Sequence, residues 1–188
     1  MRIIAGGLGG RVLKTVEGEG YRPAMGRTRE ALFSMLASRG LVWGETRVLD
    51  LFAGTGQLGI ECLSRGAESA VFVDRRPDAV KLIRENLKVT DLTDRARVVS
   101  GDSMEFLKSL REPFDIILLD PPYAAGLLEP AIAHIAKFDI LRPHGIMVAE
   151  SALDQTLPAL PAPYSLYREY RYGKIKVTIY HRAGEEEA

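Results

Sequence analysis

The sequence predicts an α/β fold of the doubly wound type, with a mostly parallel seven-stranded sheet and an antiparallel hairpin at its C-terminal end. Two observations support this prediction. Short apolar runs alternate with segments of helical periodicity through the middle of the chain, which is the pattern of βα units and a parallel sheet. Two final runs rich in Tyr, Val and Ile flank Gly173, which indicates a hairpin at the sheet edge.

The expected strands are short apolar or alternating runs that end at turn residues. They begin with the run from Val48 and continue at 69–74, 96–100, 114–119, 146–150, 166–172 and 174–181. The run 114–119 is apolar on both faces, as a central parallel strand requires. Residues 1–13 are expected to form a small hairpin-like appendage of short strands around a glycine-rich turn.

The expected helices place apolar side chains at helical spacing. They cover 28–38, a segment that follows Gly56, 77–89, 103–110 and 127–137. Thr28 is the expected N-cap of the first of these helices, and Gly40 is its expected end. Pro77 suits the opening turn of its helix, because that turn tolerates proline.

The length of 188 residues predicts one domain with a substantial core. Within it we expect an N-terminal extension of hairpin and helix at 1–40, a main domain at 41–182 and an acidic tail at 183–188. The single cysteine, Cys62, excludes a disulfide within the chain and suits a small core position.

Targeting and metal signals are weak throughout the chain. No charged and then apolar leader opens the sequence, and no apolar run reaches membrane-spanning length, so we expect a cytoplasmic protein without a membrane partner. The histidines His134, His144 and His181 are scattered and lack zinc-ligand spacing, so no metal site is expected.

The formal net charge of zero conceals two basic ends and an acidic middle. Residues 1–40 carry seven Lys or Arg against three Glu, and residues 164–182 carry five against one, whereas residues 41–163 carry thirteen basic and eighteen acidic side chains. If the fold brings both ends to one side, they form a positive surface suited to phosphate backbones. On charge alone, ordinary solvated faces explain the pattern equally well.

The stretch 48–61 contains a strand, a glycine turn and the start of a helix. Gly54, Gly56 and Gly59 have the spacing of a dinucleotide fingerprint, because a chain that turns sharply under a ligand needs positive φ and no intervening side chain. The glycines alone do not identify the ligand.

Two acids lie near this loop, and the first of them narrows the choice of ligand. Asp50 just precedes the loop, where a carboxylate would repel a pyrophosphate but suits the ammonium of an amino acid end. S-adenosylmethionine has such an end, and it is the expected cofactor. Asp74 lies about twenty residues beyond the loop, where a carboxylate can accept hydrogen bonds from both ribose hydroxyls of either kind of cofactor.

Asp102 follows the third expected strand in the same way. It could accept a hydrogen bond from an adenine amino group, since ligands of open α/β sheets bind at the carboxyl ends of the strands. It could equally be the N-cap of the helix that begins at Ser103.

The fourth expected strand ends in Asp120-Pro121-Pro122-Tyr123, and these residues suit a base with an exocyclic amine. Such an amine is a poor nucleophile, so a catalyst must bind its N–H groups with hydrogen-bond acceptors. The Asp120 carboxylate and a main-chain carbonyl of the proline pair are suitable acceptors. Tyr123 supplies a face on which an extruded base can stack. No metal is required, because the methyl donor carries a positive sulfur as its leaving group.

Together these motifs resemble those of the RsmD family of class I S-adenosylmethionine-dependent methyltransferases, which act on guanine N2 of 16S ribosomal RNA. Besides residues 120–123, the resemblance covers Arg2-Ile3-Ile4-Ala5-Gly6-Gly7, Arg22-Pro23 followed by Arg27-Thr28-Arg29-Glu30-Ala31-Leu32-Phe33, and Asp50-Leu51-Phe52-Ala53-Gly54-Thr55-Gly56 followed by Leu58-Gly59-Ile60-Glu61. At Ala24-Met25-Gly26 the chain departs from the family, which usually has Thr and an acid there.

The resemblance implies a Rossmann-like methyltransferase fold, a product of N2-methylguanosine, and the small ribosomal subunit as partner. The implied cofactor-site residues are Asp50, Ala53, Gly54, Thr55, Gly56, Asp74, Arg75, Asp102 and Ser103. The implied catalytic residues are Asp120, Pro121, Pro122 and Tyr123, and the implied RNA-binding residues are Arg22, Arg27 and Arg29. A monomer is expected.

Three alternatives stay open. The acceptor geometry of residues 120–123 serves any exocyclic amine, so an adenine-N6 methyltransferase of DNA or RNA is one of them, although the chain has no sizeable extra domain for reading a DNA sequence. A dinucleotide-dependent oxidoreductase would use the three glycines and Asp74, but Asp50 and the proline pair argue against it. A non-catalytic RNA-binding protein could keep the same fold.

Overall fold

A computed structural model of the protein describes residues 1–15, 23–39, 41–122 and 125–184. Its seven strands form one sheet in the order β3-β2-β1-β4-β5-β7-β6. The strands are β1 (Arg47–Asp50), β2 (Ser69–Asp74), β3 (Ala96–Ser100), β4 (Phe114–Leu119), β5 (Leu141–Ala152), β6 (Tyr164–Tyr172) and β7 (Ile175–Arg182). The first five strands run parallel, and β7 is antiparallel to both β5 and β6. The predicted doubly wound fold with an antiparallel C-terminal hairpin is confirmed.

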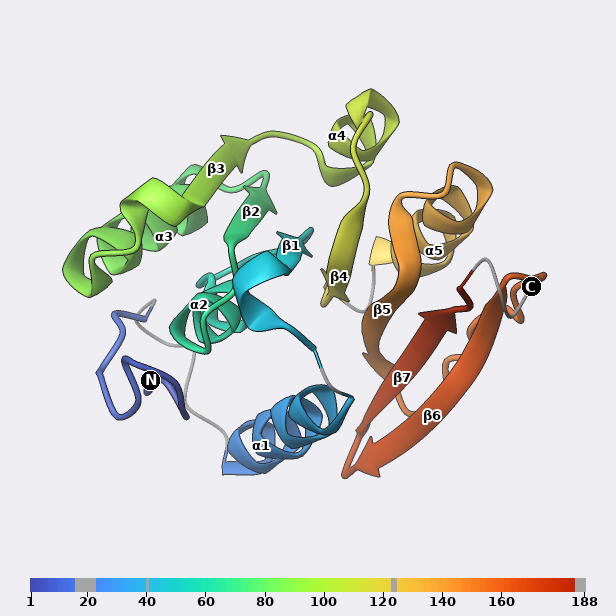
Figure 1. Ribbon diagram of the computed structural model, residues 1–188, viewed down its shortest axis with the longest axis horizontal. Coiled ribbons are helices and arrows are strands. Elements are labelled where there is room, and N and C mark those ends of the chain that lie inside the picture. The colour runs from blue at the N-terminus through green and yellow to red at the C-terminus, as the bar shows by residue number, and fades with distance from the viewer. Residues whose placement is uncertain (16–22, 40, 123–124, 185–188) are drawn as a thin grey trace.

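Helices cover both faces of the sheet, with α1, α2 and α3 on one side and α4 and α5 on the other (Figure 1). The helices are α1 (Pro23–Ser38), α2 (Gln57–Ser64), α3 (Pro77–Thr90), α4 (Ser103–Ser109) and α5 (Leu128–Lys137). Each layer has its own core, with Phe33, Ile60 and Ile83 in the first and Leu107 and Ile132 in the second. Cys62 is fully buried in the first core, as predicted.

Two elements differ from the predicted boundaries by more than two residues. Helix α1 begins at Pro23, so the prediction that Thr28 is its N-cap is wrong; proline is compatible with the first turn, and the residues after it continue the helix. The predicted end at Gly40 lies outside the described residues. Strand β5 begins at Leu141 rather than at the predicted Ile146. An irregular segment lies inside this strand, because the pairing with β4 shifts register there and His144 has a positive φ of 62°.

The N-terminal segment forms the predicted hairpin-like appendage, which is also held by the helix layer. Arg2 and Val12 form an antiparallel bridge, and further main-chain hydrogen bonds join the two sides of the hairpin. Glu61 of α2, only 1% exposed, accepts hydrogen bonds from the main-chain N–H groups of Ile4 and Ala5 at 2.7 and 3.0 Å. This buried carboxylate therefore fixes the segment against α2.

Close packing of α2 on β2 gives a first testable prediction. A Cβ atom at Gly59 would lie 2.3 Å from the ring of Phe72, so Gly59→Ala should lower the free energy of unfolding by about 2 kcal/mol through overpacking. Urea unfolding measures this loss. Gly44→Ala is the control, because a Cβ there meets open space and should leave stability nearly unchanged. Equal stability of both variants would contradict the close approach of α2 to β2.

Candidate active site at the carboxyl edge of the sheet

Carboxylates gather where three neighbouring strands end. Strand β1 lies between β2 and β4, and Asp50 pairs in register with Phe72 on one side and Leu118 on the other. Asp74 is the last residue of β2, and Asp120 directly follows β4. The parallel register therefore brings the three acids predicted from the sequence to one edge of the sheet, where ligands of open α/β sheets bind.

The glycine loop between β1 and α2 has the left-handed backbone that its glycines permit. Gly54 has a φ of 52° and Gly56 a φ of 75°, which residues with a side chain rarely adopt. A Cβ atom at Gly54 would meet nothing within 4 Å, so the space above this residue is open to a ligand. At Gly56 it would lie 3.0 Å from the Ile83 side chain, so this glycine also lets α3 pack against the loop.

Asp74 connects the loop to the turn that follows β2. Its Oδ2 accepts a hydrogen bond from the Gly54 N–H at 2.8 Å, and its Oδ1 accepts one from the Arg76 N–H at 2.8 Å. The carboxylate is thus held at the position predicted for a ribose contact. Arg75, predicted beside it, is exposed.

Asp50 lies below the loop and is 1% exposed. Its Oδ2 accepts a hydrogen bond from the Gly59 N–H of α2 at 3.0 Å. Burial is the main cause that raises the pKa of Asp50 to about 7; the bond from Gly59 opposes this shift, and the nearby Asp74 adds to it. The predicted contact of Asp50 with the ammonium of a cofactor stays a prediction.

Asp120 lies beside a second acid that sequence reasoning missed. Burial raises the pKa of Asp120 well above its ordinary value, and the carboxylates of Glu150 and Asp50 raise it further. Glu150, near the end of β5, lines a small hollow together with Pro121 and Pro122. The fourth residue of the motif, Tyr123, lies outside the described residues.

The strand ends on both sides complete the edge. Asp102 is the N-cap of α4, since its Oδ1 accepts hydrogen bonds from the next helical N–H groups at 2.9 and 3.0 Å, so the capping alternative is confirmed. The Ser103 hydroxyl, buried, donates to the Leu51 carbonyl at 2.7 Å and ties α4 to the end of β1. The Ala53 N–H donates to the Val73 carbonyl at 3.0 Å.

Asn86 of α3 is another residue that sequence reasoning missed. Fully buried, it accepts a hydrogen bond from the Lys14 N–H at 2.8 Å and donates to the carbonyls of Lys14 and Thr55 at 3.1 and 3.3 Å. It thereby joins the N-terminal segment to the glycine loop. A signal existed, because an amide on the apolar stripe of a helix, between Ile83 and Leu87, needs a specific partner.

The structure describes the three predicted RNA-binding arginines to different extents. Arg22 lies outside the described residues, and Arg27 lies in the first turns of α1 with its side chain outside the description. Arg29, in the next turn, is half-buried.

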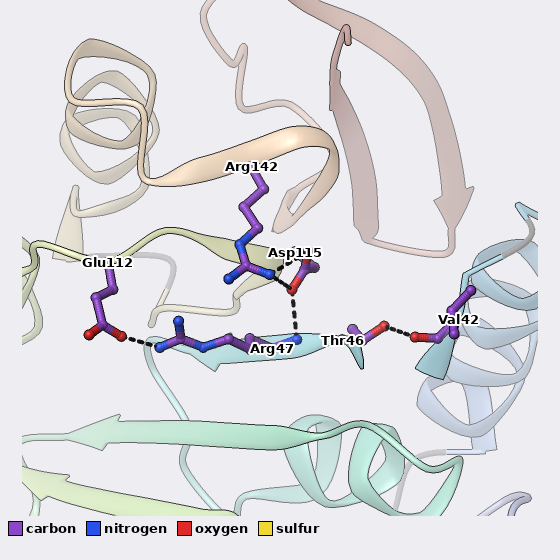
Figure 2. Close-up of polar contacts among 6 residues, drawn as sticks. All are labelled: Val42, Thr46, Arg47, Glu112, Asp115 and Arg142. Atoms are coloured by element: carbon purple, nitrogen blue, oxygen red, sulfur yellow. Dashed lines mark hydrogen bonds and ion pairs between the residues drawn. The ribbon is translucent and has the colours of Figure 1, made fainter. Parts of the chain in front are cut away.

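A larger cavity lies at the opposite edge of the sheet, away from the acids at the carboxyl ends. Its volume is about 460 Å³, and its walls come from the starts of β4 and β5, the segment before β1 and the end of β7. Figure 2 shows how this edge is held. Asp115 of β4 accepts a hydrogen bond from the Arg47 N–H at 2.8 Å and forms an ion pair with Arg142 at 3.2 Å. This network joins β1, β4 and β5 at their amino ends.

The described ranges, 1–15, 23–39, 41–122 and 125–184, contain neither a metal-ligand cluster nor a membrane-spanning helix. No three His, Cys, Asp or Glu side chains of these ranges are grouped as metal ligands would be. No helix within them is long and apolar enough to cross a membrane.

Known proteins resemble the chain over its whole length. The family model described as "Conserved hypothetical protein 95" matches residues 1–181. "Ribosomal RNA small subunit methyltransferase D" of Escherichia coli (strain K12) is 36% identical over 188 residues, which cover 100% of this chain and 93% of the relative. The chain belongs to the RsmD family. The resemblance predicted from the sequence is confirmed.

Other members and solved structures agree with this assignment. The RsmD-family relative "Putative rRNA methyltransferase YlbH" of Bacillus subtilis is 38% identical, covering 98% of this chain and 100% of the relative. The structure of "Putative methyltransferase yhhF from Escherichia coli" matches with a TM-score of 0.87 at 34% identity, covering 98% of this chain and 99% of that one. The class I methyltransferase fold is therefore confirmed.

The raised pKa of Asp50 predicts a pH-dependent stability. Between pH 5 and about 7 the folded chain holds a proton on Asp50 that the unfolded chain has released, so the free energy of unfolding falls as the pH rises through this range. Asp50→Asn removes the contribution. Relative to this variant, the wild type should lose about 2 kcal/mol between pH 5 and pH 8, as measured by urea unfolding without cofactor.

The control for this prediction is Asp94→Asn, which makes the same charge change at an exposed side chain. Its stability should follow the wild-type pH dependence. If the stabilities of wild type and Asp50→Asn instead change in parallel with pH, the raised pKa of Asp50 is refuted.

Proposed function

We propose that this RsmD-family chain transfers a methyl group from S-adenosylmethionine to the exocyclic N2 amine of a guanine in 16S ribosomal RNA. The observation that carries the proposal is the position of Asp120-Pro121-Pro122 at the end of β4, on the strand next to the glycine loop that follows β1. The names of the relatives support ribosomal RNA of the small subunit as the substrate. Guanine N2 rests on the family resemblance and on the acceptor groups described below.

The residues at the carboxyl edge fit S-adenosylmethionine. When bound, it supplies a methyl carbon on a positively charged sulfur, which keeps the electron pair of the bond that breaks. Positions 54 and 101 have open space where a Cβ would stand, so a ligand can approach the backbone closely there. Asp50 has a raised pKa, and a bound cation would stabilise its ionised form. The structure of SMU.776, a putative methyltransferase in complex with SAH, shares the fold of this chain, with a TM-score of 0.69 at 16% sequence identity.

The cofactor-site residues carried over from the sequence keep their proposed roles. Asp74 would accept hydrogen bonds from the ribose hydroxyls while holding the loop through Gly54. The others are Asp50, Ala53, Thr55, Gly56, Arg75, Asp102 and Ser103. Because Asp102 caps α4 through Oδ1, a ligand contact would use its other oxygen.

Asp120 and the proline pair would bind the amine of the target base. The Asp120 carboxylate accepts one N–H, and the carbonyl of Pro121 accepts the other, since the carbonyl of Pro122 already accepts the Ala125 N–H at 2.9 Å. These bonds localise the lone pair on nitrogen, which forms the new bond to the methyl carbon. One amine proton then leaves towards Asp120, whose raised pKa suits a proton acceptor. Tyr123 would stack on the base.

An RNA strand could reach this site along the outer strand of the sheet, β6 (Figure 1). Five side chains form what we call the β6 ladder, namely Arg39, Tyr167, Arg168, Tyr170 and Tyr172. Arg39 lies 4.4 Å from the centre of the Tyr167 ring, Arg168 lies 5.9 Å from that of Tyr170, and the rings of Tyr170 and Tyr172 stack at 6.3 Å. Alternating arginines and aromatic rings bind single-stranded RNA through phosphates and stacked bases.

Strand pairing places one end of the β6 ladder at the carboxyl edge. Ala152 at the end of β5 pairs with Ile175, which in turn pairs with Tyr172. Tyr170 pairs with Val177, which pairs with Glu150 beside Asp120. The ladder therefore leads towards the proposed base site.

The proposal is tested by transfer of labelled methyl from S-adenosylmethionine to undermethylated small subunits, deproteinised 16S RNA and DNA, followed by nucleoside analysis. N2-methylguanosine from the ribosomal substrates supports the proposal. N6-methyladenine would keep the chemistry of Asp120 and overturn the choice of base. Binding of a nicotinamide dinucleotide in place of S-adenosylmethionine would restore the oxidoreductase alternative, and cofactor binding without any transfer would favour a non-catalytic role.

Asp120→Ala should lower kcat for methyl transfer at least about 100-fold, because one acceptor for the reacting amine is lost. Equilibrium binding of S-adenosylmethionine should be nearly unchanged. Asp154→Ala, at an exposed acid just after β5, is the control and should keep wild-type turnover. Normal turnover by Asp120→Ala would refute the proposed role of the motif.

Arg168→Gln should raise KM for the RNA substrate several-fold and reduce the slope of log KM against log salt by about one, because one phosphate contact is lost. The matched control is Arg97→Gln, an exposed arginine on β3 at the opposite edge of the sheet. Cofactor affinity should stay the same in both variants. Equal effects of the two substitutions on KM would show that the β6 ladder is not the RNA path.

A further inference from the structure

Glu150 lies on the strand next to Asp120 and on the same face of the sheet. Leu118 of β4 pairs with Val148 of β5, and both contribute to the core under α1, α2 and α3. Because side chains alternate along a strand, the residues two positions further on, Asp120 and Glu150, project to that same face. They come after the last core pair, so they stand side by side at the carboxyl edge.

The two carboxyl groups are close enough to act on one another. Burial is the largest cause of the raised pKa of Asp120, and the charge of Glu150 is the second largest. Glu150 also forms part of the wall of the hollow that Pro121 and Pro122 line, with Gln155 on the same wall. A ligand group bound by Asp120 and the prolines would therefore meet Glu150 as its neighbour.

Two like charges held close together disfavour the folded chain without a ligand. Each raises the free energy of ionising the other, and an apolar residue at position 150 would avoid this effect. Such a pair is typical of a site that binds a ligand with matching hydrogen-bond donors. The group that Asp120 and the prolines are proposed to bind belongs to a nucleobase, so the edge of that base decides what Glu150 can do.

Guanine presents two kinds of donor side by side on its Watson–Crick edge, the N2 amine and the N1–H. Adenine also has an exocyclic amine, but its N1 is an acceptor without a hydrogen. We propose that Glu150 accepts the N1–H of the target guanine while Asp120 accepts an N–H of its N2 amine, so that Glu150 is the residue that selects guanine. This inference rests on the proposed function and assigns its choice of base to one side chain.

The proposed pairing explains both why guanine is accepted and why adenine is rejected. The Glu150 carboxylate has only acceptor oxygens, so it can bind the N1–H of guanine. An adenine in the same position would place its N1 lone pair against the Glu150 oxygens, leaving two buried acceptors facing one another. Sites built to hydrogen-bond a particular donor reject an analogue that lacks it more strongly than apolar pockets reject a change in size.

The test compares guanine with 2-aminopurine, which keeps the 2-amine but has an acceptor at N1. Small subunits are reconstituted with 16S RNA that carries either base at the position that the wild type modifies, and kcat/KM is measured for wild type and E150Q. We expect the wild type to prefer guanine at least about 100-fold. In E150Q the preference should fall about tenfold or more, because the Gln amide can donate to N1 of 2-aminopurine.

A merely structural role for Glu150 would lower kcat/KM for both bases together, and an unchanged preference in E150Q would overturn the inference. E150D is the second variant, since it keeps a carboxylate and should keep the preference for guanine even if turnover falls. D154N, with the same charge change at an exposed acid after β5, should resemble the wild type. Thermal unfolding of each variant confirms that it is folded.

Failure of this inference and failure of the proposed function are distinguishable. If the wild type modifies guanine but shows no preference over 2-aminopurine, only the role of Glu150 is overturned. If the wild type transfers no methyl group to guanine N2 in any ribosomal substrate, the proposed function fails and the assignment of Glu150 fails with it.

Discussion

The geometry of the site depends on two carboxylates that fasten the glycine loop and the helix that follows it. Asp50 accepts the Gly59 N–H at the start of α2, and Asp74 accepts the Gly54 N–H within the loop. The loop cannot move independently of β1 and β2 while these bonds persist. Because both acids end parallel neighbouring strands, the same register that builds the sheet also sets the shape of the loop.

Acidic side chains are concentrated at the carboxyl edge, although their mutual repulsion disfavours the folded state. The charge of Asp74 helps to raise the pKa of Asp50, and the charges of Glu150 and Asp50 help to raise the pKa of Asp120. A cationic methyl donor and a base edge rich in N–H donors are complementary to this arrangement. Repulsion between these acids therefore raises the free energy of the chain without ligands, and binding of the proposed ligands would relieve that repulsion.

Local patterns in the sequence predicted the layers, because βα alternation and the apolar run 114–119 depend on few residues at a time. The acids after the strands were predictable for the same reason, since parallel strands end at one edge. Glu150 was not, because it resembles any acid after an apolar strand until the register places it beside Asp120. The roles of Glu61 and Asn86 depend on partners more than fifty residues away, which no local pattern specifies.

The fastening of the N-terminal segment has a consequence for the order of folding during synthesis. Ile4 bonds to Glu61, and Lys14 bonds to Asn86, 57 and 72 residues further along the chain. This segment leaves the ribosome before its partners and can acquire them only after α2 and α3 have been made. Contacts of such long sequence separation form late, so the beginning of the chain completes its structure after the layer it covers.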